Sequence, residues 1–201
     1  MNREMMIKEM FSEYGFMDYY NRKISGFVDL LIEENQKYNL ASIKDEKEYL
    51  EKNLIDSLMI YRLEKKLSGS LIDIGSGNGF PGVILALTSP ELSVTLVDSN
   101  NKKISFLEKV KEKLCPELVL KYTRAEKVIE ENSPRYDYVS AKALVSDPKR
   151  WLRWTTPLLR KGGISVNYKT EQFLKEISYA GIRKELKKDR ISLYKKLEYK
   201  V

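Results

Sequence analysis

The amino-acid sequence predicts a doubly wound α/β fold, in which helices cover both faces of a mostly parallel sheet, with a helical extension at the N-terminus. From Leu71 onward, short apolar runs alternate with helical segments, a pattern typical of right-handed βαβ crossovers. A glycine-rich turn follows the first of these runs, and before it the apolar residues recur at helical spacing. We expect residues 1–69 to form the extension and residues 70–201 the α/β domain, together one structural unit.

Three helices are expected in the extension. Residues 3–14 are weakly amphipathic, and residues 17–38 carry an apolar stripe at the i, i+3, i+4, i+7 spacing of a one-sided helix. Asp45 followed by Glu48 resembles a capping box and marks the start of a third helix.

The second part of the chain is expected to alternate between strand and helix. The expected strands cover residues 71–74, 93–98, 118–122, 136–143 and 162–168. The expected helices begin near Gly82 and cover about residues 101–114, 125–131, 147–159 and 171–180. The tail from Ile191 is expected to form a final strand, paired antiparallel with residues 183–188.

Composition excludes several kinds of chemistry. The 201 residues contain no His and one Cys, which rules out Ser-His-Asp and Cys-His catalysis, His-ligated metal sites and Cys-cluster zinc sites. We therefore expect no metal. The lone cysteine, Cys115, and the lack of an apolar signal segment or of about 20 consecutive apolar residues favour a cytoplasmic protein without a membrane span.

Charge is unevenly distributed along the chain. The formal net charge is +7, yet residues 142–201 carry 16 Lys+Arg against 6 Asp+Glu, and residues 1–141 carry 20 against 23. Such asymmetry suggests a partner rich in phosphates, and solvated helix faces are the alternative. The expected phosphate contacts include Lys149, Arg150, Arg153, Arg160 and Lys161. Trp151 and Trp154 are expected either to pack against the sheet or to stack on a flipped base.

The sharpest local signal is the segment LIDIGSGNGFPG at residues 71–82. A strand that ends in Asp73 leads into glycines spaced D-x-G-x-G-x-G, which turn the chain tightly and let a ligand approach the backbone. The dinucleotide pattern G-x-G-x-x-G fails because Phe80 occupies its sixth position. A carboxylate here suits S-adenosylmethionine, which carries an ammonium and a sulfonium, better than a pyrophosphate. Asp98, at the end of the second strand, is placed to accept hydrogen bonds from ribose hydroxyls.

Several motifs together resemble the RsmG (GidB) family, bacterial methyltransferases that modify a guanine N7 in small-subunit ribosomal RNA. The matching segments are DIGSGNGFPG at 73–82, YNLASI at 38–43, IDSL at 55–58, TRAE at 123–126 and DYVSAKA at 137–143. The resemblance implies a Rossmann-like, S-adenosylmethionine-dependent methyltransferase fold, with 16S ribosomal RNA or the small ribosomal subunit as partner. We expect the chain to act as a monomer.

The glycine motif and the resemblance together give three sets of expected site residues. The cofactor-binding residues are Asp73, Gly75, Gly77, Gly79, Phe80, Asp98, Ala125 and Glu126. The catalytic residues are Asn39, Arg124 and Lys142, and the substrate-binding residues are Lys142, Lys169 and Arg190.

Three positions depart from the family's motifs. The His of its H-x-x-D-S-L motif is Asn53 here, and the Arg of its S-R-A motif is Lys142. Residues 167–170 keep the Lys of an A-x-K-G motif and lose the Gly. Because a Lys lacks the planar fork with which an Arg makes bidentate contacts, these departures concern the substrate more than the cofactor.

Methyl transfer to guanine N7 does not require a histidine. This nitrogen offers an in-plane lone pair and has no proton to lose, so proximity and orientation supply much of the rate. A cationic donor at the neighbouring O6 would hold the base in register, and Lys142 is the first candidate. Its alternative role is that of a surface lysine at a strand end.

Three other functions are alternatives to this one. A methyltransferase of the same fold that acts on another RNA, a protein or a small molecule is compatible with Asn53 and Lys142. An NAD-dependent oxidoreductase conflicts with the glycine spacing. A non-catalytic RNA-binding relative would keep the fold and the basic surface without the reaction.

Overall fold

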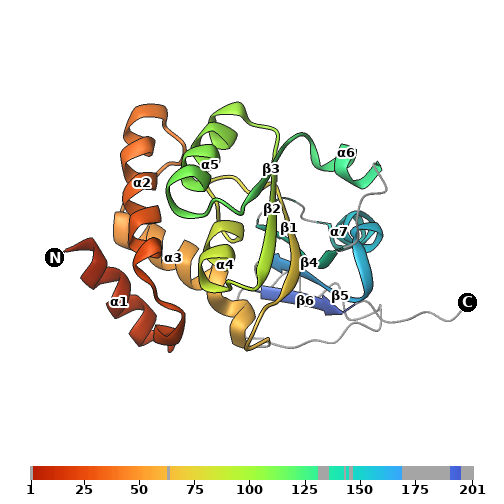
Figure 1. The fold of residues 1–201 in the computed structure, drawn as a ribbon, viewed down its shortest axis with the longest axis horizontal. Helices are drawn as coiled ribbons and strands as arrows, with labels where there is room; N and C mark the ends of the chain where they lie inside the picture. The colour runs from red at the N-terminus through yellow and green to blue at the C-terminus, as the bar shows by residue number, and fades with distance from the viewer. Residues whose placement is uncertain are drawn as a thin grey trace, which may run out of the picture.

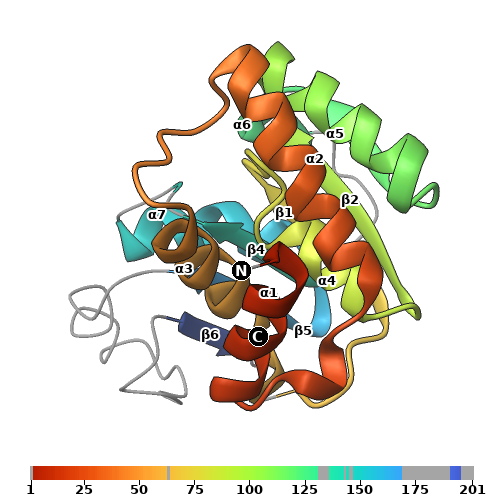
Figure 2. The ribbon, with the colours of Figure 1, turned by 90° about the vertical axis from the view of Figure 1, so that its left-hand side faces the viewer.

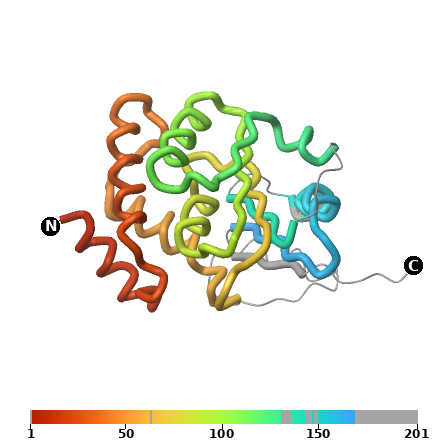
Figure 3. Tube along the Cα trace, viewed as in Figure 1, coloured from red at the N-terminus to blue at the C-terminus, as the bar shows by residue number. Residues whose placement is uncertain are grey.

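The fold is described from a computed structural model. The structure describes residues 2–62, 64–130, 136–142, 144, 147–168 and 191–195. Figure 3 follows the trace of the chain. The helix expected at 171–180, the strand expected at 183–188, Lys169 and Arg190 lie outside the described residues.

Within the described residues, six strands form one sheet in the order β3-β2-β1-β4-β5-β6. The strands are β1 (Gly69–Ile74), β2 (Leu92–Asp98), β3 (Val119–Tyr122), β4 (Tyr136–Lys142), β5 (Leu159–Tyr168) and β6 (Ile191–Lys195). Strands β1 to β5 run parallel, and β6 pairs antiparallel with β5. The doubly wound, mostly parallel sheet predicted from the sequence is confirmed.

Strand β1 lies where the winding of the sheet reverses. Its neighbours are β2 on one side and β4 on the other, so the chain runs outward through β2 and β3 and then returns to β4. In open α/β sheets, ligands bind outside the carboxyl ends of the strands at this switch point. The glycine-rich turn after β1 occupies this position.

Helices cover both faces of the sheet (Figure 1). Helices α4 (Gly82–Thr88) and α5 (Asn101–Leu114) pack on one face, and α6 (Ala125–Glu130) and α7 (Pro148–Thr155) pack on the other. Two hydrophobic cores result, one on each side of the sheet.

The alternation of side chains along β1 decides what each residue faces. Leu71 belongs to the core under α4 and α5, whereas Ile72 and Ile74 belong to the core under α6 and α7. Asp73 therefore points toward the α4 side, where its carboxylate meets the amide of Gly82.

The N-terminal helices pack on the α4 and α5 side of the molecule (Figure 2). They are α1 (Arg3–Glu13), α2 (Arg22–Tyr38) and α3 (Glu46–Leu58), with short 3₁₀ turns at Met17–Tyr19 and Met59–Arg62. One hydrophobic core contains Phe27 of α2, Leu54 of α3, Val83 of α4 and Phe106 of α5. In the described chain, residues before and after residue 69 therefore share one apolar core.

The structure changes the expected elements in two places. The single helix expected at 17–38 is divided, because the Asn21 side chain accepts a hydrogen bond from the Lys23 amide and starts α2 anew. Helix α7 ends at Thr155 and a 3₁₀ turn, Thr156–Leu158, follows, since Pro157 has no amide hydrogen to continue a helix. The strand expected from Ile191 is confirmed as β6. None of the described helices is long and apolar enough to cross a membrane.

Candidate active site at the glycine loop

The glycine loop, residues 75–81, joins β1 to α4. Gly75, Gly77 and Gly79 all have positive φ angles, of 71°, 55° and 88°, which side chains rarely adopt. A Cβ atom at Gly75 would lie 2.9 Å from Leu144 Cδ1, and one at Gly79 would lie 2.7 Å from Val83 Cγ2. At Gly77 the nearest atom would be 3.8 Å away, so the backbone there borders open space that a ligand can enter.

Hydrogen bonds to β2 hold this loop in place. The amides of Gly75 and Ser76 both donate to the carbonyl oxygen of Val97, at 2.8 and 3.0 Å. The Ser76 hydroxyl donates to the Asp73 carbonyl oxygen at 2.8 Å and accepts from the Val97 amide at 3.1 Å. The loop conformation is therefore set before any ligand arrives.

Asp73, which was expected to bind the cofactor, is completely buried beneath the glycine loop. Its Oδ1 accepts from the Ser140 hydroxyl at 2.7 Å, and its Oδ2 accepts from the Gly82 amide at 3.3 Å. Burial raises the pKa of Asp73 to about 6, because the ionised form loses its hydration. Asp73 thus ties β1 to β4 and α4, and the preference for a cationic cofactor does not rest on an exposed charge at this position.

Asp98 is the last residue of β2, as predicted from the sequence, and its side chain contacts the glycine loop. Its Oδ2 accepts from the Gly77 amide and its Oδ1 from the Asn100 amide, both at 2.8 Å. The side chain is partly exposed. Each carboxylate oxygen has a second lone pair, so Asp98 retains the capacity to accept further hydrogen bonds.

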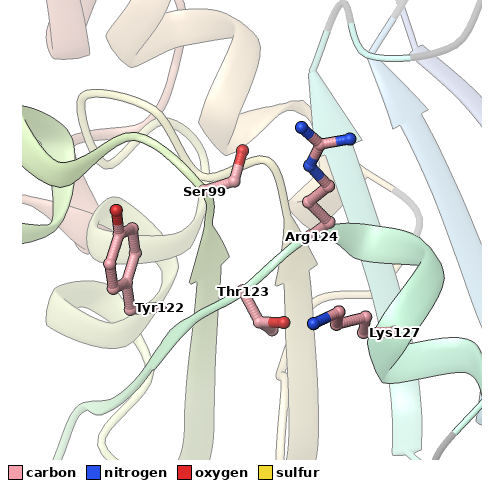
Figure 4. A pocket seen from close by; sticks show the side chains of 5 residues that line it. All are labelled: Ser99, Tyr122, Thr123, Arg124 and Lys127. Carbon is pink, nitrogen blue, oxygen red and sulfur yellow. The ribbon is translucent and has the colours of Figure 1, made fainter.

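A pocket of about 230 Å³ opens beside Asp98, between the ends of β2 and β3 (Figure 4). Its lining residues are Ser99, Tyr122, Thr123, Arg124 and Lys127. The Thr123 amide donates to the Asp98 carbonyl oxygen at 3.1 Å, which fixes this wall relative to β2. In Figure 4, the Lys127 side chain extends toward Thr123.

On the other side of the loop lies the Lys142 cluster, formed by Asn53, Asp56, Phe80 and Lys142. The Lys142 ammonium donates to Asn53 Oδ1 at 2.6 Å and lies 3.7 Å from Asp56 Oδ2. It is also 5.9 Å from the centre of the Phe80 ring, which belongs to the glycine loop. The structure thus places Lys142 beside the loop and brings together two positions, 53 and 142, that depart from the family's motifs.

A second lysine connects the glycine loop to the N-terminal helices. The Lys103 ammonium donates to the Asn78 side-chain oxygen of the loop and to the Leu40 carbonyl oxygen. Burial lowers the pKa of Lys103, because the charged ammonium is partly removed from water. The Asn78 amide in turn donates to the Tyr49 hydroxyl of α3 at 3.2 Å.

Of the other expected catalytic residues, Arg124 lies apart from Lys142, and Asn39 ends a helix. Arg124 follows β3, which β2 and β1 separate from β4, so the two strand ends are about 14 Å apart at the usual strand spacing. Asn39 has a φ of 50° and caps the C-terminus of α2, where its side chain is exposed. Arg124 instead lines the pocket near Asp98.

The basic surface expected from the sequence is divided by the fold. Arg160 and Lys161 lie near the start of β5, at the amino edge of the sheet and therefore opposite the glycine loop, and Arg160 pairs with Asp137. Arg150 and Arg153 belong to α7, which begins after β4. Trp151 is fully buried in the core under α7, so it packs against the sheet.

The residues present fit S-adenosylmethionine. No side chain covers the backbone at Gly77, Asp98 presents carboxylate oxygens that can accept hydrogen bonds from hydroxyl groups, and a pocket opens beside it. Among the described residues, no group of three or more Cys, Asp and Glu side chains is placed to hold a metal ion.

Comparisons with known proteins agree with this geometry. The sequence profile of the GidB family, described as rRNA small subunit methyltransferase G, matches residues 20–199. Ribosomal RNA small subunit methyltransferase G of Alkaliphilus metalliredigens is 35% identical over 88% of this chain and 76% of its own length. The Mesoplasma florum protein of the same name is 41% identical over 61% of this chain and 52% of its own length. The O-methyltransferase from Bacillus cereus in complex with SAH has a similar fold, with a TM-score of 0.55 and 14% identity over 71% of this chain and 65% of that one.

Fold and site together define a Rossmann-like methyltransferase that uses S-adenosylmethionine. Within that class, the chain belongs to the GidB family, rRNA small subunit methyltransferase G.

Sequence reasoning treated Asn53 only as a departure and did not anticipate Lys103 or Leu144. Asn53 and Asp56 are three residues apart on α3, so helical spacing puts both on one face, and this signal was available. Leu144 covers Gly75 through a fold-dependent contact that no local pattern announces.

Proposed function

We propose that this chain transfers the methyl group of S-adenosylmethionine to N7 of a guanine in 16S ribosomal RNA. The observation that carries the proposal is the Lys142 ammonium, held beside Phe80 of the glycine loop in a chain of the methyltransferase G family. A cation in this place is suited to meet guanine O6, the acceptor next to N7. The printed names of the relatives, which specify small-subunit ribosomal RNA, support this substrate.

Cofactor binding is assigned to the loop and to the ends of β2 and β3. The Gly77 backbone and the Asp98 carboxylate hold the ribose side, and the pocket lined by Ser99 and Arg124 receives the adenine. Ala125 and Glu126 begin α6, next to this pocket. Asp73 contributes by fixing the loop from below.

The bound cofactor supplies the methyl group as an electrophile at its sulfonium. Lys142 would donate a hydrogen bond to O6 and leave the lone pair of N7 free to accept the methyl group. Neither a base nor a metal is required from the chain, because N7 loses no proton. Lys169 and Arg190 remain predicted substrate contacts from the resemblance, outside the described residues.

Residues 1–69 and 70–201 are proposed to act as one structural unit, since apolar residues of both share a core. We further propose a cytoplasmic monomer that recognises the small subunit or its 16S ribosomal RNA. A single, buried Cys115 supports a reducing compartment.

The proposal is tested by incubating the purified chain with small ribosomal subunits and S-adenosylmethionine labelled in its methyl group. We expect label in 16S ribosomal RNA and none in ribosomal protein. Label in protein only, or binding of S-adenosylmethionine without any transfer, would favour a methyltransferase for another substrate or a non-catalytic relative.

A further inference from the structure

We propose that Asn53 is a positioning residue, whose amide oxygen holds the Lys142 ammonium where it meets the carbonyl oxygen of the substrate base. This inference rests on the proposed function, in which Lys142 contacts guanine. It assigns a task to a residue of α3 that has no direct contact with the reacting atoms.

The surrounding hydrogen bonds determine which way the Asn53 amide points. Its Nδ2 donates to the Tyr49 carbonyl oxygen, one turn earlier in α3, at 2.7 Å. That carbonyl oxygen can only accept, so the Nδ2 group must face it and Oδ1 must face the Lys142 ammonium. The oxygen is therefore fixed by the helix backbone.

A lysine side chain has four rotatable bonds, and its ammonium stays in one place only where fixed acceptors hold it. Asn53 provides such an acceptor at 2.6 Å, and the Lys142 side chain is only 16% exposed. Asp56 Oδ2, at 3.7 Å, forms an ion pair with the same ammonium. The Asn53 oxygen adds a short, directed hydrogen bond to this ion pair, so two side chains of α3 together fix the position of the ammonium.

The contact joins distant parts of the sequence. Asn53 and Lys142 are 89 residues apart, and the fold brings them into one hydrogen bond.

A double-mutant cycle tests the pairing, with methyl transfer to small subunits as the readout. Asn53→Ala is expected to lower kcat at least 10-fold and to leave the dissociation constant for S-adenosylmethionine within twofold. In the Lys142→Ala background, the same change is expected to alter kcat less than twofold, because the ammonium is already absent. Gln36→Ala removes an exposed amide of α2 and serves as the matched control.

Two outcomes would overturn the proposal: an equal fractional loss in both backgrounds, which would make Asn53 merely structural, or full activity of Asn53→Ala. An unmodified chain that transfers no methyl group would contradict the proposed function itself. A second measurement does not depend on activity: acetylation of Lys142, followed by mass spectrometry, should be at least threefold faster in Asn53→Ala. An unchanged rate of acetylation would contradict the proposal that Asn53 fixes the Lys142 ammonium.

The variant Asn53→Leu keeps a side chain of similar shape if the alanine variant folds poorly. It removes the acceptor for the Lys142 ammonium, so we expect kcat to fall at least 10-fold with cofactor affinity retained. Unchanged kcat in this variant would show that shape alone matters at position 53 and would overturn the proposal.

Discussion

The carboxylate of Asp98 accepts a hydrogen bond from the backbone amide of Gly77 at 2.8 Å, so the end of β2 holds the glycine loop after β1. The other carboxylate oxygen accepts from the Asn100 amide near the start of α5, also at 2.8 Å. One side chain therefore organises the backbone on both sides of the proposed ribose position.

Removing this carboxylate should weaken cofactor binding. Asp98→Ala leaves the Gly77 amide without its acceptor, and hydrogen bonds to charged groups contribute about 1.5–3 kcal/mol, so we expect a 10- to 100-fold loss of affinity. Calorimetry with S-adenosylmethionine measures the change. The control is Asp18→Ala, which removes an exposed aspartate near the N-terminus. Unchanged affinity in Asp98→Ala would contradict the assignment of the ribose site.

Gly82 allows α4 to pack closely on the sheet. An added Cβ atom would lie 2.3 Å from Leu96 Cδ2 and 2.8 Å from Asp73 Oδ2, so Gly82→Ala should lower the free energy of unfolding by about 1–3 kcal/mol. In α2, Gly26→Ala meets only the end of Leu114 at 3.3 Å, and we expect it to be neutral or stabilising. Urea denaturation of both variants measures the difference. Equal stabilities would show that the sheet accommodates the extra methyl group.

Asp73 gives the stability of the chain a characteristic pH dependence. Its pKa is raised from 3.8 to about 6 in the folded state, so the folded chain binds more protons than the unfolded chain between these values. The stability that Asp73 contributes is therefore greatest at low pH and is lost as the pH rises through 6. Between pH 4 and pH 7, the free energy of unfolding of the unmodified chain should fall by up to about 3 kcal/mol relative to that of Asp73→Asn.

This difference is measured by urea denaturation of both proteins across that pH range. Subtracting the variant removes the contributions of all other titrating groups. A difference that stays constant, or that grows in favour of the unmodified chain as the pH rises, would contradict the burial of an ionisable Asp73.

Glu34 tests whether the N-terminal helices and the α/β domain unfold together. This buried carboxylate of α2 forms ion pairs with two lysines. Its Oε2 lies 2.5 Å from the Lys109 ammonium of α5, and its Oε1 lies 3.3 Å from the Lys37 ammonium. Glu34→Ala should destabilise the whole chain by about 1–2 kcal/mol, since a buried charged hydrogen bond is lost while the lysines remain partly hydrated. Glu33→Ala removes an exposed partner of Lys37 and should destabilise the chain much less than Glu34→Ala, because solvent screens an exposed ion pair.

Intrinsic fluorescence and circular dichroism should report one coincident transition for both variants. Two separated transitions, with only the earlier one shifted by Glu34→Ala, would show that residues 1–69 fold independently.

The strands and most helices followed from local signals. Apolar runs bounded by glycine, serine and asparagine predicted the ends of β1 and β2 to within two residues. The helix expected at residues 101–114 has the same bounds as α5. Asp98 was placed correctly at the end of β2 because a strand end is a local feature.

The orientation and partners of site residues were harder to predict. Alternation along β1 already implied that Asp73 points away from Ile72 and Ile74, yet the motif alone suggested a cofactor ligand. The contact between Asn53 and Lys142 depends on how α3 is placed relative to the carboxyl end of β4, which no local pattern specifies. Tertiary placement, not residue type, decides these roles.

The most direct test of the central claim is mass spectrometry of nucleosides from 16S ribosomal RNA after reaction of small subunits with the chain and S-adenosylmethionine. We predict one additional 7-methylguanosine per 16S molecule, and strongly reduced formation when Lys142→Ala replaces the unmodified chain. A methyl group on another nucleoside, or unchanged 7-methylguanosine while ribosomal protein gains methyl groups, would contradict the account.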